Sequence, residues 1–382
     1  MTSEARARRR WRPARGPLVR VMAASAVAGA LVTLTACANG VSPEGSRTGT
    51  RPATEAKIGL LLPDSVTPRY STADYPLFKA AVAERCPRCQ VLYQNAAGSA
   101  AAQQQQAQAM ITQDVSVLVL DPFDRQAAAA IVTQARAKGI PVIAYDRLVD
   151  SGGLAAYVSF DNEKIGELQA RSLVDRMRAL GLPDDAGILE INGSPTDNNA
   201  RLYQQGARNV LKTTGYRVLG SFDTPGWDPI KAQQWASGQI AKVGADEIKG
   251  VYAANDDLAA AAISALQSAG VATLPPVTGQ DASLAGLQRV IAGEQYMTVY
   301  KAFKPEATKA AELALDLAAG KSVSLPTTAT TATGQVVPAM LLDTVPVTAD
   351  DIADTVVKDG VFTVEDLCTA PYAAACERIG LE

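Results

Sequence analysis

From Ala56 onward, short apolar runs alternate with longer segments in which apolar residues recur at helical spacing. Five runs form a first series, at 57–62, 90–94, 115–120, 141–145 and 156–160; five form a second, at 187–191, 216–221, 250–253, 276–279 and 297–300. Helical spacing marks the segments between them, such as 100–113, 125–138, 164–180 and 257–269. Near-continuous apolar strands that helices separate indicate parallel sheets covered on both faces. The two series therefore predict an α/β fold with two doubly wound parallel-sheet lobes.

The first 36 residues have the layout of a secretory signal: seven arginines come before an apolar run at about 21–34, and small residues follow it. The run is shorter than the ~20 residues of a membrane-spanning helix. The sequence Leu34-Thr35-Ala36-Cys37 resembles the lipobox of bacterial lipoproteins. This resemblance implies cleavage before Cys37, a lipid on that residue, and attachment to the outer face of the cell membrane. Cleavage without a lipid and a twin-arginine export route stay open as alternatives.

Residues 37–56 are rich in Ser, Gly, Thr and Pro, and we expect them to form a flexible tether. About 345 residues follow the expected cut, enough for two domains. The whole sequence has a net charge of −3, and because seven arginines and one glutamate precede the cut, the rest of the chain has a net charge of −9. Nucleic-acid binding needs basic surface, so we expect no nucleic-acid partner.

The sequence contains no histidine, which excludes a Ser-His-Asp triad, a Cys-His pair and a histidine-based zinc site. We expect neither a metal nor a cofactor. Besides Cys37, four cysteines remain, at Cys86, Cys89, Cys368 and Cys376. They allow three pairings, of which two local bridges are the simplest. A redox role for the first pair is the alternative, but redox Cys-x-x-Cys pairs begin a helix, whereas this pair follows a predicted helix and precedes a strand.

Polar and aromatic side chains follow nearly every predicted strand, at the edge where open parallel sheets bind ligands. Carboxylates accept hydrogen bonds, Arg and Lys donate them, and Asn does both. Tyr and Trp offer flat apolar surface. A sugar, with its hydroxyl groups and apolar C–H faces, matches this combination. Taken singly, acids such as Asp121, Asp161 and Asp257 are better explained as helix caps.

Several motifs resemble the D-xylose-binding proteins of bacterial ABC importers. They are Tyr145-Asp146-Arg147 and the segments 159–170, 193–200, 254–256, 279–282 and 297–301, in matching order within about 57–364. The resemblance implies a type I periplasmic-binding-protein fold, with two lobes that close over a pyranose and a hinge of three crossings. We expect an N-terminal lobe at 57–160 plus 301–333 and a C-terminal lobe at 162–299 plus 338–348. A tail at 349–382, with a short strand at 360–364, is expected to pack across the lobes.

The resemblance also implies a sugar pocket, carried over position by position. Its expected residues are Asp64, Arg69, Tyr70, Asp146, Arg147, Asn198 or Asn199, Trp227, Asn255, Asp281 and Lys301. The sequence departs from the family in three places. The loop at 65–68 is less polar than usual, Tyr70 stands where Trp is frequent, and Ala254 replaces a frequent Ser. A related group that binds several sugars shares the main motifs, so glucose, galactose and arabinose stay open beside D-xylose.

The resulting expectation is a monomeric, lipid-anchored solute-binding protein that delivers an aldopyranose to an ABC permease. The sequence has no phosphate-binding loop of the G-x-x-x-x-G-K-[ST] type, so ATP would be hydrolysed by a separate subunit. A sugar-sensing co-receptor for a membrane receptor or kinase is an alternative. A glycosidase that uses Asp146 and Asp281 is disfavoured, because it needs a carboxyl group with a raised pKa and the neighbouring Arg147 and Lys301 would lower it. We therefore expect no enzyme activity.

Overall fold

The computed structural model describes residues 53–381. The predicted signal peptide, Cys37 and most of the predicted tether lie outside the described residues. Within the described part, no helix is long and apolar enough to cross a membrane.

The first lobe is built on a seven-stranded sheet with the strand order β10-β11-β5-β4-β3-β1-β2. Its strands are β1 (Lys57–Leu62), β2 (Gln90–Asn95), β3 (Val117–Leu120), β4 (Val142–Tyr145), β5 (Ala156–Phe160), β10 (Thr327–Thr330) and β11 (Val336–Leu342). Neighbouring strands pair in parallel, except that β10 and β11 are antiparallel. The first series of apolar runs corresponds to β1–β5.

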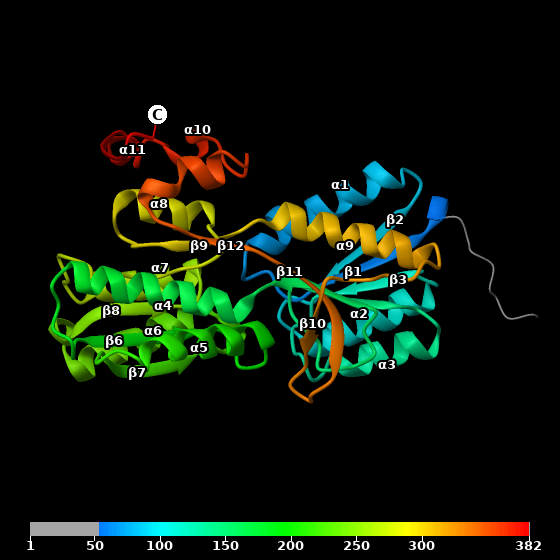
Figure 1. The fold of residues 1–382 in the computed structure, drawn as a ribbon, viewed down its shortest axis with the longest axis horizontal. Helices are drawn as coiled ribbons and strands as arrows, with labels where there is room; N and C mark the ends of the chain where they lie inside the picture. The colour runs from blue at the N-terminus through cyan, green and yellow to red at the C-terminus, as the bar shows by residue number, and fades with distance from the viewer. Residues whose placement is uncertain (1–52, 382) are drawn as a thin grey trace, which may run out of the picture. The chain divides into compact units, whose positions relative to one another are not determined.

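Helices cover both faces of this sheet (Figure 1). On one face lie α1 (Tyr75–Arg85) and α9 (Phe303–Ala318); on the other lie α2 (Ala100–Thr112) and α3 (Ala129–Ala137). Along β1, the side chains of Ile58, Leu60 and Leu62 belong to the core beneath α1 and α9. Leu61 belongs to the core beneath α2 and α3. Successive side chains of a strand point to opposite faces, so a strand buried on both sides must be apolar throughout.

The second lobe contains a three-stranded parallel sheet in the order β7-β6-β8. Its strands are β6 (Gly187–Asn192), β7 (Arg217–Asp223) and β8 (Ile248–Ala253); its helices are α4 (Asn162–Ala179), α5 (Asn198–Leu211), α6 (Pro229–Val243), α7 (Asp256–Ser268) and α8 (Leu284–Ala292). Helix α4 packs on α5, and α6 on α7. The run at 276–279, predicted as a strand, makes a single parallel bridge between Val277 and Val251.

The chain passes between the two lobes three times, at Asp161, Ala302 and Asp343. The second crossing follows β9 (Thr298–Lys301), and the third leads to β12 (Thr344–Val347), which pairs antiparallel with β9. This is the type I periplasmic-binding-protein fold that the motifs imply. One predicted boundary needs correction, since residues 338–342 belong to the first lobe rather than the second. They continue the apolar strand β11, which pairs in parallel with β5 through Leu342.

The residues after β12 pack on the second lobe. Leu367 and Cys376 share an apolar cluster with Leu287 and Ile291 of α8, together with Tyr300 of β9. We predicted packing across both lobes, whereas this cluster draws its partners from the second. The strand predicted at 360–364 is wrong. In its place a turn leads into α10 (Val364–Leu367), whose start is fixed by reciprocal side-chain caps between Thr363 and Asp366. A last helix, α11 (Ala373–Ile379), follows.

Both predicted local disulfides are present, between Cys86 and Cys89 and between Cys368 and Cys376. Cys86 directly follows α1, and β2 begins one residue after Cys89. The first bridge thus closes a turn between a helix end and a strand. This is the place that the sequence predicts for the pair, away from the helix start where redox motifs lie.

Candidate functional site

A small cavity lies where the strand ends of the two lobes meet. Its lining combines carboxylates, cations, amides and aromatic rings: Thr67, Arg69, Tyr70, Asp146, Arg147, Asp197, Asn199, Tyr203, Trp227, Asn255, Gln280, Asp281 and Lys301. The lining therefore offers hydrogen-bond donors, acceptors and flat apolar surface together.

The loop after β1 brings Arg69 to the cavity. Asp64 shapes this loop by accepting hydrogen bonds from the backbone N–H groups of Val66 (3.1 Å) and Thr67 (3.0 Å). A π-helical turn, Tyr70–Asp74, then leads into α1. Asp74 turns back and binds the Arg69 guanidinium at both Nε and Nη2, each at 2.8 Å. The strand end and the turn together hold the arginine rigidly.

Arg69 lies among three carboxylates and an aromatic ring. Besides Asp74, it pairs with Glu306 of α9 at 2.8 Å and with Asp146 at 3.1 Å. The ring of Phe303 lies 4.0 Å from the guanidinium carbon. Burial acts to lower the pKa of Arg69, but the three carboxylates outweigh it and raise the pKa well above its ordinary value. Arg69 is therefore a fixed positive charge in the wall of the cavity.

Asp146 directly follows β4 and has a positive φ of 53°, a conformation that Asp adopts more readily than most residues. Three donors hold its carbonyl oxygen: Ser159 Oγ at 2.6 Å, Tyr157 OH at 3.0 Å and Asn199 Nδ2 at 3.0 Å. Burial acts to raise the pKa of Asp146, yet the charges of Arg69, Lys301 and Arg147 lower it overall. The carboxylate thus faces the cavity as an ionised hydrogen-bond acceptor.

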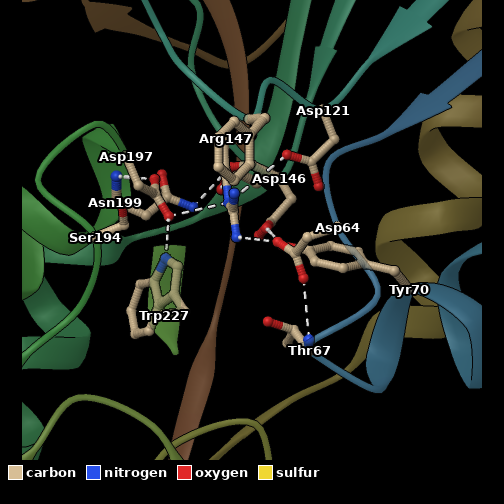
Figure 2. Close-up of polar contacts among 12 residues, drawn as sticks. Asp64, Thr67, Tyr70, Asp121, Asp146, Arg147, Ser194, Asp197, Asn199 and Trp227 are labelled. Atoms are coloured by element: carbon tan, nitrogen blue, oxygen red, sulfur yellow. Dashed lines mark hydrogen bonds and ion pairs between the residues drawn. The ribbon is translucent and has the colours of Figure 1, made fainter. Parts of the chain in front are cut away.

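In the second lobe, Asp197 organises the wall of the cavity. Its Oδ1 accepts a hydrogen bond from the backbone N–H of Asn199 (2.8 Å), which caps α5. Its Oδ2 accepts one from Trp227 Nε1 (3.0 Å), so the indole ring is held in place, as Figure 2 shows. The ring passes so close to the backbone that a Cβ atom at Gly193 would lie 2.1 Å from it. Glycine is therefore required at that position.

The second lobe also contributes an ion pair to the cavity wall, in which Lys301 Nζ lies 2.9 Å from Asp281 Oδ1. Lys301 ends β9 beside the second crossing, and its ammonium group lies 5.4 Å from the centre of the Phe160 ring. Asp281 has a φ of 93°, within the left-handed region that favours glycine. A non-glycine residue costs energy there, and such strain gathers at binding sites.

The two lobes contact each other directly around the cavity. Arg147 Nε of the first lobe pairs with Asp197 Oδ2 of the second at 2.9 Å (Figure 2). Beside this pair, the backbone N–H of Arg125 donates to the carbonyl oxygen of Thr196 at 3.1 Å. Arg147 also lies 3.4 Å from Asp64 within its own lobe. The lobes are closed in this structure.

Nine of the predicted site residues line the cavity, and two do not. Asp64 stands behind it as the partner of Arg147 and of the loop backbone. Asn198 is turned aside and accepts a hydrogen bond from Arg201. Whether the nine contact a ligand stays a prediction. Of the three acids expected to be helix caps, Asp161 caps α4, whereas neither Asp121 nor Asp257 caps a helix in the described part.

Sequence reasoning missed four lining residues: Thr67, Asp197, Tyr203 and Gln280. Asp197 and Gln280 lie inside motifs that were recognised, but a motif does not tell which of its side chains turn inward. Tyr203 had a signal, since it lies four residues after Asn199 and therefore on the same face of α5. Among residues 53–381, no group of three His, Cys, Asp or Glu side chains is placed to hold a metal ion.

Comparison with known proteins gives consistent matches. Residues 58–322 match the family model of the periplasmic binding protein domain. The D-xylose-binding periplasmic protein of Escherichia coli is 36% identical over 319 residues, which cover 82% of this chain and 93% of that protein. The multiple sugar-binding periplasmic receptor ChvE of Rhizobium radiobacter is 34% identical, covering 69% and 79%.

Solved structures agree with the sequence matches. A carbohydrate transporter solute-binding protein from Chloroflexus aurantiacus, in complex with D-glucose, has a TM-score of 0.75 and 28% identity. The match covers 81% of this chain and 97% of that one. An ABC transporter solute-binding protein from Clostridium phytofermentans, with bound β-D-glucose, has a TM-score of 0.74 and 26% identity, covering 81% and 99%.

Proposed function

Because this chain belongs to the periplasmic-binding-protein family, we propose that it captures an aldopyranose outside the cytoplasmic membrane and delivers it to the permease of an ABC importer. D-xylose is the first candidate, since two relatives of 36% and 37% identity are D-xylose-binding proteins. Glucose, galactose and arabinose follow it, because ChvE is a multiple-sugar receptor and the solved neighbour from Chloroflexus aurantiacus holds D-glucose.

The observation that carries this proposal is the alternation of charge around the cavity. Three ion pairs line it, each joining a cation to a carboxylate: Arg69 with Asp146, Arg147 with Asp197, and Lys301 with Asp281. A sugar hydroxyl both donates and accepts hydrogen bonds, so each pair offers a match for both roles. Hydrogen bonds to charged groups contribute ~1.5–3 kcal/mol each, more than those between neutral groups. Paired charges also leave the cavity without a net charge, which suits a neutral ligand.

Aromatic rings supply the complement for the apolar side of a sugar. Trp227 is fixed through its indole N–H and lies edge-on to Tyr203, with 6.4 Å between ring centres. Tyr70 contributes a ring from the first lobe. A pyranose ring has flat C–H faces that pack on such surfaces. The cavity thus has polar groups for the hydroxyls and a flat wall for the ring.

The mechanism that follows is capture by closure. A sugar in the cavity touches side chains of both lobes, so it binds the closed form more tightly and shifts the population toward it. Three crossing segments act as the hinge. The closed protein then docks on its permease, which opens the lobes and takes the sugar. ATP hydrolysis belongs to another subunit of the importer.

Turnover of a glycoside is the competing function, and the electrostatics disfavour it. A glycosidase needs a carboxyl group with a raised pKa as its general acid. Asp146 has a lowered pKa because three cations surround it, and Asp281 is bound by Lys301 at 2.9 Å. We therefore propose a binding protein without enzyme activity. We further propose that it is a monomer, held at the outer face of the membrane by a lipid on Cys37.

A thermal-shift panel of the purified protein against pentoses and hexoses tests this function. A ligand that binds the folded state stabilises it by RT ln(1 + [L]/Kd), ~2.7 kcal/mol at a hundredfold excess over Kd. We expect D-xylose to raise the melting temperature by several degrees. A rise with glucose or arabinose alone would keep the function and change the sugar. Unchanged melting with every monosaccharide would contradict the proposal.

A further inference from the structure

The carboxyl group of Asp121, at the end of β3, takes no part in the cavity wall. Its side chain is 0% exposed, and among residues 53–381 neither of its oxygens has a hydrogen-bond partner. Arg147 Nε lies 3.8 Å from Oδ1, beyond hydrogen-bond distance. A carboxylate that is buried without hydrogen bonds is strongly disfavoured, and such a group ordinarily takes up a proton. Asp121 is thus an acid whose ionised form the closed structure does not support.

Asp121 lacks a close partner because Arg147, the nearest cation, is bound more closely by another acid. Its guanidinium is shared among three acids, two from its own lobe and one from the other (Figure 2). Asp197 of the second lobe holds Nε at 2.9 Å, while Asp64 and Asp121 of the first lobe lie at 3.4 and 3.8 Å. The shortest contact is therefore the one that exists only while the lobes are together. When they part, Arg147 keeps the two acids of its own lobe as partners.

The second lobe also contacts the chain just after Asp121. The loop that follows Asp121 meets the loop 194–197 of the second lobe through three hydrogen bonds. Arg125 donates to the carbonyl oxygens of Thr196 (3.1 Å, from the backbone) and Pro195 (3.3 Å, from Nη1). Thr196 Oγ1 in turn donates to the carbonyl oxygen of Phe123 at 3.4 Å. Opening breaks all three contacts and brings water to the end of β3.

Four charged residues from three elements surround Asp121: Arg69 before the π-helical turn, Asp146 and Arg147 after β4, and Asp197 before α5. Tyr70, in the π-helical turn, interacts with Asp121 as well. Burial is the largest influence on the Asp121 carboxyl group, and it raises the pKa well above the ordinary value. Asp146 and Asp197 raise it further, while Arg147 and Arg69 lower it. The second lobe supplies Asp197 and the contacts to residues 123 and 125, so opening the lobes removes part of what raises this pKa.

We propose that sugar capture takes up one proton at Asp121, which is ionised and paired with Arg147 in the open form and neutral in the closed form. The proton comes from the solvent, binds a carboxylate oxygen as the lobes close, and returns to solvent when the permease opens them. This inference rests on the proposed capture of a sugar by closure. In this proposal a proton binds together with the sugar, and the two leave together when the lobes open.

The sign of the pH dependence follows from linkage. The closed form has the higher pKa at Asp121, so it binds more protons than the open form at pH values between the two pKa values. Sugar affinity is therefore greatest at the acid end of this window. It falls as the pH rises through the window, by at most about tenfold per pH unit for one proton. Above the pKa of the closed form the dependence ends.

The test is a calorimetric titration with D-xylose, or with whichever monosaccharide raises the melting temperature, at one mildly acidic pH. Buffers with different ionisation enthalpies are compared, and the change in observed heat gives the number of protons taken up. We expect an uptake above zero and at most one proton for the unmodified protein. The Asp121→Asn variant has the same shape, and we expect it to bind the sugar without proton uptake.

Asp257→Asn is the matched control, since Asp257 is another partly buried acid with a raised pKa, and we expect the uptake to persist in this variant. Unchanged uptake in Asp121→Asn, or its loss in Asp257→Asn, would overturn the inference. So would ordinary sugar binding without proton uptake in the unmodified protein, and this outcome would leave the proposed function intact. A protein that binds no monosaccharide would contradict the proposed function first and this inference with it.

Discussion

Arg147 and Asp197 join the two lobes through an ion pair of 2.9 Å that is almost fully buried. The arginine comes from the end of β4 and the aspartate from the cap of α5, so the contact exists only in the closed form. Asp197 also fixes Trp227, which means that one carboxylate ties together a helix start, an aromatic wall and the opposite lobe. The Arg147–Asp197 ion pair therefore stabilises the closed state in addition to any contacts that a ligand makes.

Replacement of Asp197 by Asn should weaken sugar binding by about 100-fold or more. Removal of one partner of a buried ion pair costs about 3–5 kcal/mol, because the other charge stays buried without compensation. Calorimetric titration measures the loss. Asp161→Asn serves as the control, since Asp161 caps α4 in the same manner but is exposed. If both variants bind the sugar equally well, Asp197 does not stabilise the closed form.

The pair of Lys301 and Asp281 should behave as a unit. Each of the single variants Lys301→Met and Asp281→Asn leaves a buried charge without its partner, and we expect at least a tenfold loss of sugar affinity from each. The double variant should lose less than the sum of the two, because residues in direct contact are not additive. Lys321→Met, at the exposed pair with Asp316, should leave affinity unchanged. Additive losses in the double variant would argue against coupling.

Asp257 should make stability depend on pH. Burial, with the charges of Asp281 and Asp256, raises the pKa of Asp257 to about 6, against about 3.9 in an unfolded chain. The folded state therefore favours the protonated form. The cost of ionising Asp257 is absent below about pH 4, grows as the pH rises to about 6, and is constant above that.

It follows that Asp257→Asn should be more stable than the unmodified protein near neutral pH, by about 1–2 kcal/mol after allowance for solvent screening. The two proteins should be equally stable near pH 4. Urea denaturation at both pH values gives the comparison. Asp175→Asn, at an exposed helical position, should show no such difference. A gain in stability at acid pH instead of neutral pH would reverse the assigned sign.

The identity of residue 37 should determine whether the protein is found in the membrane fraction. If a lipid on this cysteine anchors the chain, Cys37→Ser should move the protein from the membrane fraction to the soluble extracytoplasmic fraction, with sugar affinity unchanged. Fractionation and immunoblotting of cells that express each form measure this. Retention of the Cys37→Ser protein on membranes would argue against a lipid anchor.

Much of the fold was accessible from sequence, because a buried parallel strand must be largely apolar on both faces. The strands β1 and β5 are such runs, interrupted only by Lys57 and Ser159 among the polar residues, and they begin and end at their predicted bounds. The end of the first lobe was not accessible. Val336–Leu342 reads equally well as a strand of either lobe, and the choice depends on pairing with β5. Long-range pairing leaves no local mark in the sequence.

The site shows a similar division. The family resemblance placed Asp146, Arg147 and Lys301 in the predicted pocket, and their position just after or at the end of predicted strands agrees with it, since the carboxyl ends of parallel strands meet at one edge. The Asp-Asn-Asn motif did not reveal that Asp197 and Asn199 face the cavity while Asn198 faces Arg201. That choice depends on the cap geometry of α5. The lack of hydrogen-bond partners for the Asp121 carboxylate oxygens in the described part likewise depends on long-range packing. No local sequence pattern predicts it.

The most direct test of the account compares sugar titrations of the unmodified protein and Asp146→Asn. Asparagine tolerates the positive φ at this position, and Arg69 keeps Asp74 and Glu306 as partners, so the variant should fold. We predict that one D-xylose binds per unmodified chain. In Asp146→Asn, affinity should fall at least about 100-fold, because a charged acceptor and its compensation are lost, while the unliganded melting temperature changes little. Equal affinity in the two proteins would show that the sugar binds elsewhere and would contradict the account.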